Sequence, residues 1–102
     1  MSLKKQFLKS KNVCKVTFEL TDDETNNAES VFIVGEFNNW DKTATEVPKL
    51  KKGSFKLTLE LETGREYQFR YLYNDSIWAN EPEADKHVPN EFGDSENSVI
   101  VL

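Results

Sequence analysis

The sequence has few of the residues on which metal centres, disulfide frameworks and most catalytic sites depend. Its 102 residues include one cysteine, Cys14, and one histidine, His87. A single cysteine excludes an internal disulfide and favours a reducing, cytoplasmic compartment. A zinc site takes about four ligands, so carboxylates would have to supply the rest. We therefore expect no metal, and we interpret Cys14 as a buried thiol and His87 as a surface residue.

Long apolar runs and glycine-rich loops are missing as well. No run approaches the roughly 20 apolar residues of a membrane-spanning helix. The four glycines are spread along the chain and are typical of turns. We therefore expect no membrane partner and no cofactor, since no glycine run could hold a phosphate.

Positive charge is scarce outside the N-terminus. The chain has 13 lysines and arginines against 18 aspartates and glutamates, yet residues 1–15 carry five lysines and no acid. Because phosphate contacts require Lys and Arg, the acidic remainder argues against nucleic acid as a partner. The lysine-rich start is either a solvated tail or a contact for an anionic partner.

What the sequence does have is alternation of apolar and polar residues, which is typical of half-buried strands. We assign residues 1–12 to a lead segment, in which Leu3, Phe7 and Leu8 have loose helical spacing, and residues 13–102 to one domain. Strands are expected at residues 14–20, 31–34, 46–50, 55–61, 67–73, 77–78 and 98–102. About seven short strands without a convincing helix predict an all-β fold, an antiparallel β-sandwich.

The first of the two tryptophans follows a strand that ends at a glycine, in the stretch VFIVGEFNNWD. We expect Gly35 to allow a tight exit from the strand and the polar residues after it to make a turn. Trp40 then either lies exposed in that turn or closes the core at the strand end, since Trp is highly buried on average.

The position of the second tryptophan depends on the loop at residues 74–76. If this is a three-residue hairpin loop, Trp78 pairs with Leu72 and shares an outward face with Arg70 and Gln68. A two-residue loop would reverse the parity and bury the indole. On an outward face, indole covers the C–H side of a sugar ring while guanidinium and amide groups bond its hydroxyls.

Three motifs occur in the order VFIVGEFNNWD, GREYQFRYLYNDSIWANEP and NEFGDSENSVIVL. Together they resemble the glycogen-binding modules, the family 48 carbohydrate-binding modules. This family includes the N-terminal early-set domains of isoamylases, the glycogen-binding domain of the β subunit of AMP-activated protein kinase, and small stand-alone bacterial proteins. The resemblance covers about residues 13–102.

The resemblance implies an immunoglobulin-like sandwich that binds α-1,4-glucan on one face. By similarity, Trp40 and Trp78 would stack on glucose rings, and Arg70 would be the basic residue that faces the ligand. Phe92 would enter the coil of the glucan from a loop, and Asn97 would bond a sugar hydroxyl. The expected partners are an α-glucan and either a glycogen-metabolising enzyme or a second copy of the chain.

Two alternatives remain beside a non-catalytic glucan-binding module. One is a protein-interaction or structural early-set domain that has lost sugar binding. The other is a small hydrolase that uses Glu81, Glu83 and Asp85, which alternate in the polar, loop-like residues 79–97. The chain is too short to build a deep cleft around them, so we interpret these carboxylates as a solvated acidic loop and expect no enzyme.

Overall fold

The computed structural model describes residues 2–90 and 95–102. Phe92, predicted to contact the glucan from a loop, lies outside the described residues. The strands are β1 (Ser2–Phe7), β2 (Val13–Leu20), β3 (Val31–Gly35), β4 (Phe55–Glu62), β5 (Glu66–Tyr73), β6 (Ile77–Ala79), β7 (Lys86–Pro89) and β8 (Glu96–Val101), and a short 3-10 helix, η1, spans Glu36–Asn38.

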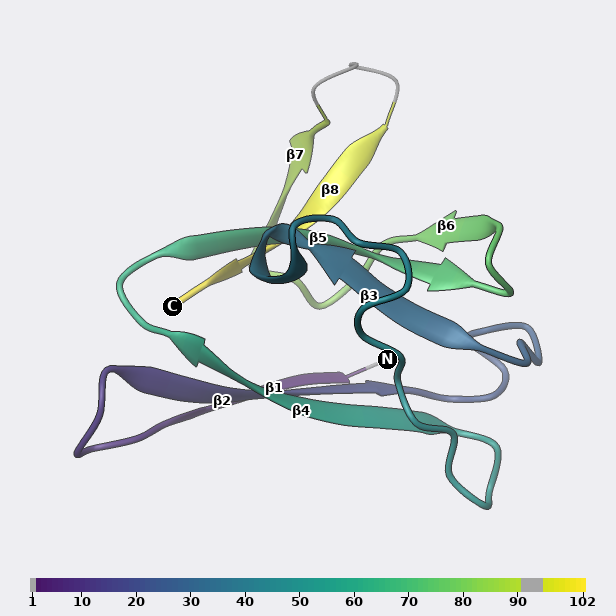
Figure 1. The fold of residues 1–102 in the computed structure, drawn as a ribbon, viewed down its shortest axis with the longest axis horizontal. Coiled ribbons are helices and arrows are strands. Elements are labelled where there is room, and N and C mark those ends of the chain that lie inside the picture. The colour runs from purple at the N-terminus through teal and green to yellow at the C-terminus, as the bar shows by residue number, and fades with distance from the viewer. Residues whose placement is uncertain (1, 91–94) are drawn as a thin grey trace.

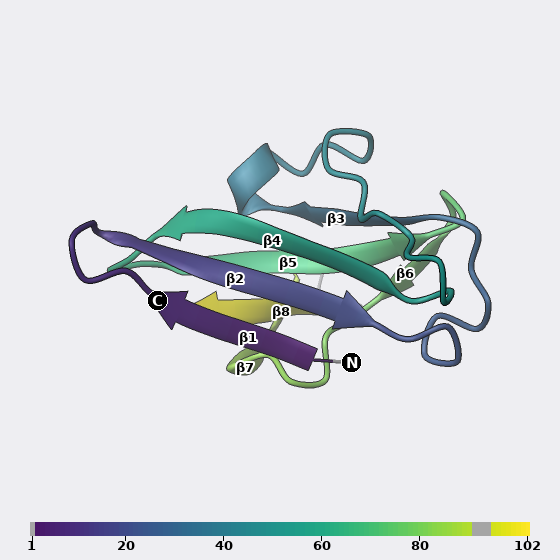
Figure 2. The same cartoon turned by 90° about the horizontal axis from the view of Figure 1, so that it is seen from below.

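The strands form two antiparallel sheets that are stacked as layers (Figures 1 and 2). The three-stranded sheet has the order β1-β2-β4, and the five-stranded sheet has the order β3-β5-β8-β7 with β6 paired to β5. The predicted all-β antiparallel sandwich is confirmed, with eight described strands instead of about seven, and the arrangement is compatible with the immunoglobulin-like early-set type.

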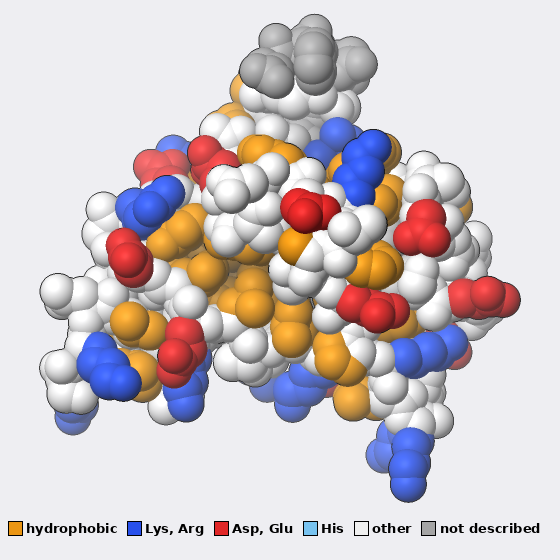
Figure 3. Space-filling view, viewed as in Figure 1, with side chains coloured by type: hydrophobic (Ala, Val, Ile, Leu, Met, Phe, Trp, Pro, Cys, Tyr) orange, Lys and Arg blue, Asp and Glu red, His pale blue; other side chains and the backbone are white. Residues whose placement is uncertain are grey.

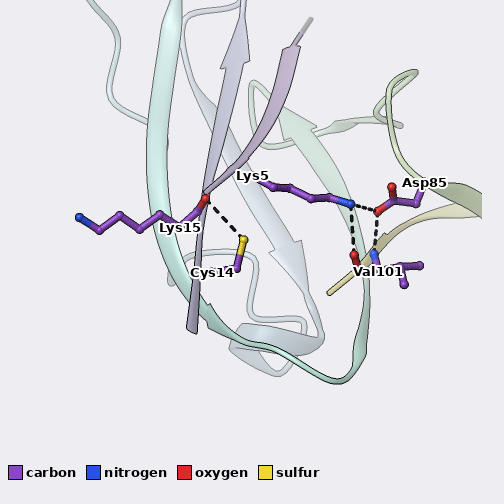
Figure 4. Close-up of polar contacts among 5 residues, drawn as sticks. All are labelled: Lys5, Cys14, Lys15, Asp85 and Val101. Carbon is purple, nitrogen blue, oxygen red and sulfur yellow. Dashed lines mark hydrogen bonds and ion pairs between the residues drawn. The ribbon is translucent and has the colours of Figure 1, made fainter. Parts of the chain in front are cut away.

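Alternate residues of the two central strands, β2 and β5, build the core. The ring of Phe18 lies with its centroid 5.5 Å from that of Phe69 and 6.4 Å from that of Tyr71, both in edge-on geometry. Such aromatic pairs contribute beyond the area they bury. Cys14 is fully buried on the same side of β2, as its parity predicted. Its Sγ lies 3.7 Å from the carbonyl oxygen of Lys15 (Figure 4).

The lead segment contributes a strand to the sandwich, and the loose helical spacing of its apolar residues does not produce a helix. Strand β1 pairs with β2 from Ser2 opposite Glu19 to Phe7 opposite Cys14. A segment this short does not form a stable helix alone. Hydrogen bonds to β2 hold it as a strand instead.

Lys5 ties this edge strand to the opposite sheet (Figure 4). Its Nζ donates to Asp85 Oδ2 at 2.6 Å and to the carbonyl of Val101 at 3.1 Å, and the same carboxylate oxygen accepts from the N–H of Val101 at 2.7 Å. An inward-pointing lysine on an edge strand also disfavours pairing with another chain.

Two predictions of secondary structure are wrong. Residues 46–50 are not a strand, because the segment crosses between the layers: Glu46 bridges to Phe32 in one sheet and Lys49 bridges to Phe55 in the other (Figure 1). The stretch expected as a loop at residues 79–97 contains β7, which pairs with β8. Its residues, KHVP, lack the alternation by which a strand is identified from sequence.

Some hydrophobic side chains at the margin of the core are only partly covered. In Figure 3 hydrophobic side chains gather in the middle of the face that is seen also in Figure 1. Phe37, Leu57 and Leu59 are partly buried hydrophobic residues that pack against the core.

Within the described residues, no helix has the length and hydrophobicity needed to span a bilayer.

Candidate functional site

The hairpin between β5 and β6 has the register that places Trp78 on the outward face. Tyr73 pairs with Ile77 and Leu72 pairs with Trp78, so the three-residue loop is confirmed. Asn74 and Asp75 in this loop have left-handed backbone angles, with φ of 50° and 60°. Trp78 is consequently 37% exposed.

The turn that carries Trp40 is held in an unusual backbone conformation. Asn39 and Trp40 have φ of 57° and 58°, in the left-handed region that bulky residues rarely adopt. The N–H of Trp40 donates to the carbonyl of Gly35 at 2.8 Å, and the indole is 39% exposed. Such local strain persists only where the surrounding structure determines it, and it clusters at functional sites.

The side chain of Asn38 fastens this turn to the end of β3. Its Oδ1 accepts from the N–H of Gly35 at 3.0 Å. Its Nδ2 donates to the carbonyl of Ile33 at 2.9 Å and to the hydroxyl of Thr45 at 3.0 Å. Asn38 therefore connects the strand, the turn and the segment after it, which fixes the direction in which Trp40 leaves the sheet.

Gly35 is needed for close packing and not for the tight exit that the sequence led us to expect. Its backbone is extended, with φ of −171°. A Cβ at this position would lie 2.6 Å from the carbonyl oxygen of Gln68 and 2.7 Å from the Cβ of Phe69. The glycine therefore allows β3 to approach β5 at the base of the site.

A groove of about 570 Å³ lies on the outward side of the five-stranded sheet. It is lined by Glu36, Trp40, Gln68, Arg70, Trp78, Pro89, Asn90 and Asn97. Four of the five predicted site residues are thus brought together, and the fifth, Phe92, lies outside the described residues.

Arg70 stands beside Trp78 with part of its hydrogen-bonding capacity unused. Its guanidinium carbon lies 5.4 Å from the centroid of the indole, and Lys42 Nζ lies 5.6 Å from the same ring, both within cation–π range. The Nε of Arg70 is buried and has no hydrogen-bond partner among the described residues. A buried donor without an acceptor costs free energy, so the position of this guanidinium is not set by hydrogen bonding through Nε.

The amides at the other end of the groove are oriented by one another. Asn97 is 7% exposed, and its Nδ2 donates to Gln68 Oε1 at 3.0 Å. The N–H of Gln68 donates to the carboxylate of Glu36 at 2.6 Å. The groove therefore offers two indoles, a guanidinium and fixed amide groups, which is a surface able to contact both an apolar ring face and a rim of hydroxyls.

Sequence reasoning missed several lining residues. Glu36 lines the groove, but nothing in the sequence around it marks it as a residue of a ligand site. Pro89 ends β7, a strand that was not predicted, and Asn90 follows it. Gln68 had been placed on the outward face by alternation, which the register supports.

The acidic residues after Trp78 do not form one solvated loop, so that interpretation is wrong for Glu81. Glu81 is fully buried, whereas Glu83 and Asp85 are exposed. The Glu81 carboxylate accepts from the hydroxyl of Tyr71 at 2.7 Å and from the N–H of Glu83 at 3.0 Å. A side chain satisfied in this way is buried because its hydrogen bonds replace those to water.

Burial and this carboxylate together change the titration of two tyrosines. Burial first, and then the negative charge of Glu81, raise the pKa of Tyr71 well above its ordinary value. The same two causes raise the pKa of Tyr73 to about 12.

Among the described residues, no three His, Cys, Asp or Glu side chains are grouped as metal ligands.

Comparison with known families gives one match. The family model described as carbohydrate-binding module 48 (isoamylase N-terminal domain) matches residues 25–87, more than half of the chain. The matched range includes Trp40, Arg70 and Trp78, and ends before Asn97. A search of curated proteins finds no match.

Proposed function

The chain belongs to the carbohydrate-binding module 48 family, and from that premise we propose that it is a non-catalytic module that binds α-1,4-glucan such as glycogen or starch. The observation that carries this proposal is that Trp40 and Trp78, both more than a third exposed, line one groove together with Arg70. Large exposed aromatic rings in a concave site are a mark of a ligand surface.

In the proposed complex the two indoles stack on glucose rings, and polar groups read the hydroxyl rim. The guanidinium of Arg70 donates to a sugar oxygen, and the oriented amide of Asn97 bonds another hydroxyl. Stacking is worth about 1–3 kcal/mol per ring, by analogy with base stacking. With a few hydrogen bonds of about 1 kcal/mol each, and the loss of free motion, a Kd of about 0.1–1 mM is expected.

Such a weak site would bind a polysaccharide tightly only through avidity. Several copies on one glucan, or a partner enzyme that also binds it, would raise the effective concentration of the second contact. We expect the partner to be a glycogen-metabolising enzyme or a second copy of the chain.

Retardation in native gels that contain glycogen tests the proposal. The wild-type chain is expected to be retarded, and Trp40→Ala and Trp78→Ala each to lose most of that retardation while keeping a measurable remainder at high glycogen concentration. Phe7→Ala is the matched control, because Phe7 is an exposed aromatic residue of the other sheet that does not line the groove.

A folded wild-type chain that shows no retardation, and no fluorescence change with millimolar maltoheptaose, would contradict glucan binding. A stable oligomer in light scattering, together with the same lack of retention, would favour the structural or protein-interaction role instead.

A further inference from the structure

We propose that a buried polar link through Asn80, Glu81 and Ser98 holds Trp78 and Asn97 at a fixed separation, so that Glu81 is a positioning residue of the groove. This inference rests on the proposed glucan binding. It assigns a role to the buried carboxylate that glucan binding itself leaves unused.

The need for such a link arises from the way β5 changes partner along one edge. Its last pair with β8 is Phe69 opposite Ser98, and its first pair with β6 is Tyr71 opposite Ala79. Arg70 lies between the two ladders. No ladder joins β6 to β8 among the described strands. Trp78 on β6 and Asn97 on β8 therefore belong to strands that do not pair with each other.

Three hydrogen bonds cross this junction. The N–H of Glu81 donates to Ser98 Oγ at 2.8 Å, and Ser98 Oγ donates to Asn80 Oδ1 at 2.9 Å. Asn80 Nδ2 in turn donates to the carbonyl of Glu96 at 2.9 Å. Asn80 follows Trp78 by two residues, and Glu96 and Ser98 are the immediate neighbours of Asn97. The bonds thus connect the chain on either side of the groove.

The carboxylate of Glu81 anchors the link to the core. Besides the bond from Tyr71 of β5, its second oxygen closes the turn at Glu83, and its own carbonyl oxygen lies 2.9 Å from His87 Nε2 on β7. Glu81 and Ser98 are both fully buried. Water cannot replace a lost bond there without a change of structure, so the link resists distortion.

The anchoring matters for binding because β6, the strand that carries Trp78, is short. β6 has three residues and three pairs with β5, so little else holds the position of its indole. Misplacement of a contact group by about 1 Å is enough to weaken a preorganised site.

The first test compares Glu81→Gln and Asn80→Ala with Val16→Ala, a buried control on the opposite sheet. Glutamine keeps the shape of the side chain, but an NH2 group, which donates, replaces one of the two carboxylate oxygens, which accept. Asn80→Ala removes two bonds at a partly exposed position, so it serves if Glu81→Gln does not fold. Maltoheptaose affinity is measured where urea unfolding shows each variant to be folded. We expect a loss of about threefold to tenfold for the link variants and none for Val16→Ala.

A spectroscopic readout separates positioning from general destabilisation. In Glu81→Gln and Asn80→Ala the indole N–H resonance of Trp78 is expected to shift without sugar, while that of Trp40 stays. In affinity electrophoresis on glycogen, Glu81→Gln is expected to add no loss in a Trp78→Ala background and its full loss in a Trp40→Ala background.

The outcomes distinguish this inference from the proposed function. Wild-type binding with unchanged affinity in both link variants, or losses that add fully to Trp78→Ala, would overturn the link and leave glucan binding intact. Absence of wild-type binding would overturn the proposed function and, with it, this inference.

Discussion

The outer faces of the two sheets are built from the same strand geometry but differ in how their side chains are satisfied. On the three-stranded sheet, polar residues stand opposite one another across β2 and β4: Lys15 faces Glu60, Glu19 faces Lys56, and the hydroxyls of Thr17 and Thr58 bond at 2.9 Å. Cross-strand pairs of this kind stabilise a sheet.

On the five-stranded sheet, the groove brings together two exposed indoles, a guanidinium and amides fixed in place. One face therefore sets its polar residues opposite one another across two strands, and the other gathers aromatic and polar groups around a groove. We expect substitutions on the second face, and not on the first, to change ligand binding. The predictions below test this contrast.

The largest effect is expected where β3 and β5 of the five-stranded sheet approach most closely. Gly35→Val places a side chain within 2.6–2.7 Å of backbone and Cβ atoms of β5, and neither can move without the sheet. We expect the free energy of unfolding to fall by about 3 kcal/mol, measured by urea titration. Thr58→Val, at an exposed position of the other sheet, is the control. It is expected to change the free energy of unfolding by under about 1 kcal/mol. Equal losses at the two positions would contradict the close approach.

Alkaline pH is expected to act on the core beneath the five-stranded sheet. Because the folded state raises the pKa of Tyr71 and Tyr73 while the unfolded state leaves it near 10, the unfolded chain releases protons first as the pH rises. The stability that the two tyrosines contribute is therefore fully present below about pH 10, and the free energy of unfolding falls above that pH.

The expected loss between pH 10 and 11 is about 1 kcal/mol for each of the two tyrosines. Urea unfolding at a series of pH values measures it, and absorbance near 295 nm reports tyrosine ionisation. Tyr71→Phe and Tyr73→Phe should each remove part of the slope. A stability that is flat from pH 9 to 11 would show that these hydroxyls are not held as described.

A charge on each outer face gives the most direct contrast in binding. Arg70→Met removes the groove's guanidinium, and Lys15→Met removes a cation from the paired face. We expect the first to weaken maltoheptaose binding by about tenfold, since hydrogen bonds from charged donors are worth about 1.5–3 kcal/mol. We expect the second to change it by less than about twofold. Calorimetry or NMR titration measures both, and similar affinities for the two variants would remove the proposed distinction between the faces.

Much of the fold followed from alternation, because a strand with one buried face shows a period of two. The parity of β2 and β5, the burial of Cys14 and the exposure of Trp78 through the 74–76 loop are all statements of that period. Alternation does not predict secondary structure that is determined by contacts with other segments. Residues 2–7 form a strand because they pair with β2, and residues 46–50 are irregular because they cross between the layers.

The candidate site was predictable in its aromatic and basic members, which lie on motifs, and not in its supports. Glu81 looked like one of three equivalent carboxylates, and only the positions of Tyr71 and Ser98 in space show that it is buried and bonded. Long-range contacts of this kind leave no periodic trace. The same holds for Glu36, whose carboxylate meets the N–H of Gln68, 32 residues away.

The smallest effect is expected at the tie between the two sheets, on the side away from the groove. Burial opposes ionisation of Asp85, but the hydrogen bonds from Lys5 and Val101 and the lysine's charge outweigh it and hold the pKa of Asp85 below its ordinary value. Lys5→Met is expected to lower the free energy of unfolding at pH 7 by under about 1 kcal/mol, because the pair is partly exposed. The carboxylate contributes stability above its unfolded pKa, and this contribution is lost as the pH falls through the lower folded pKa, so the difference between the wild type and the variant should shrink as the pH falls. Urea titrations from pH 2 to 7 measure this. A difference of undiminished size at pH 2 would mean that the packing of the Lys5 stem, and not its charge, joins β1 to the five-stranded sheet.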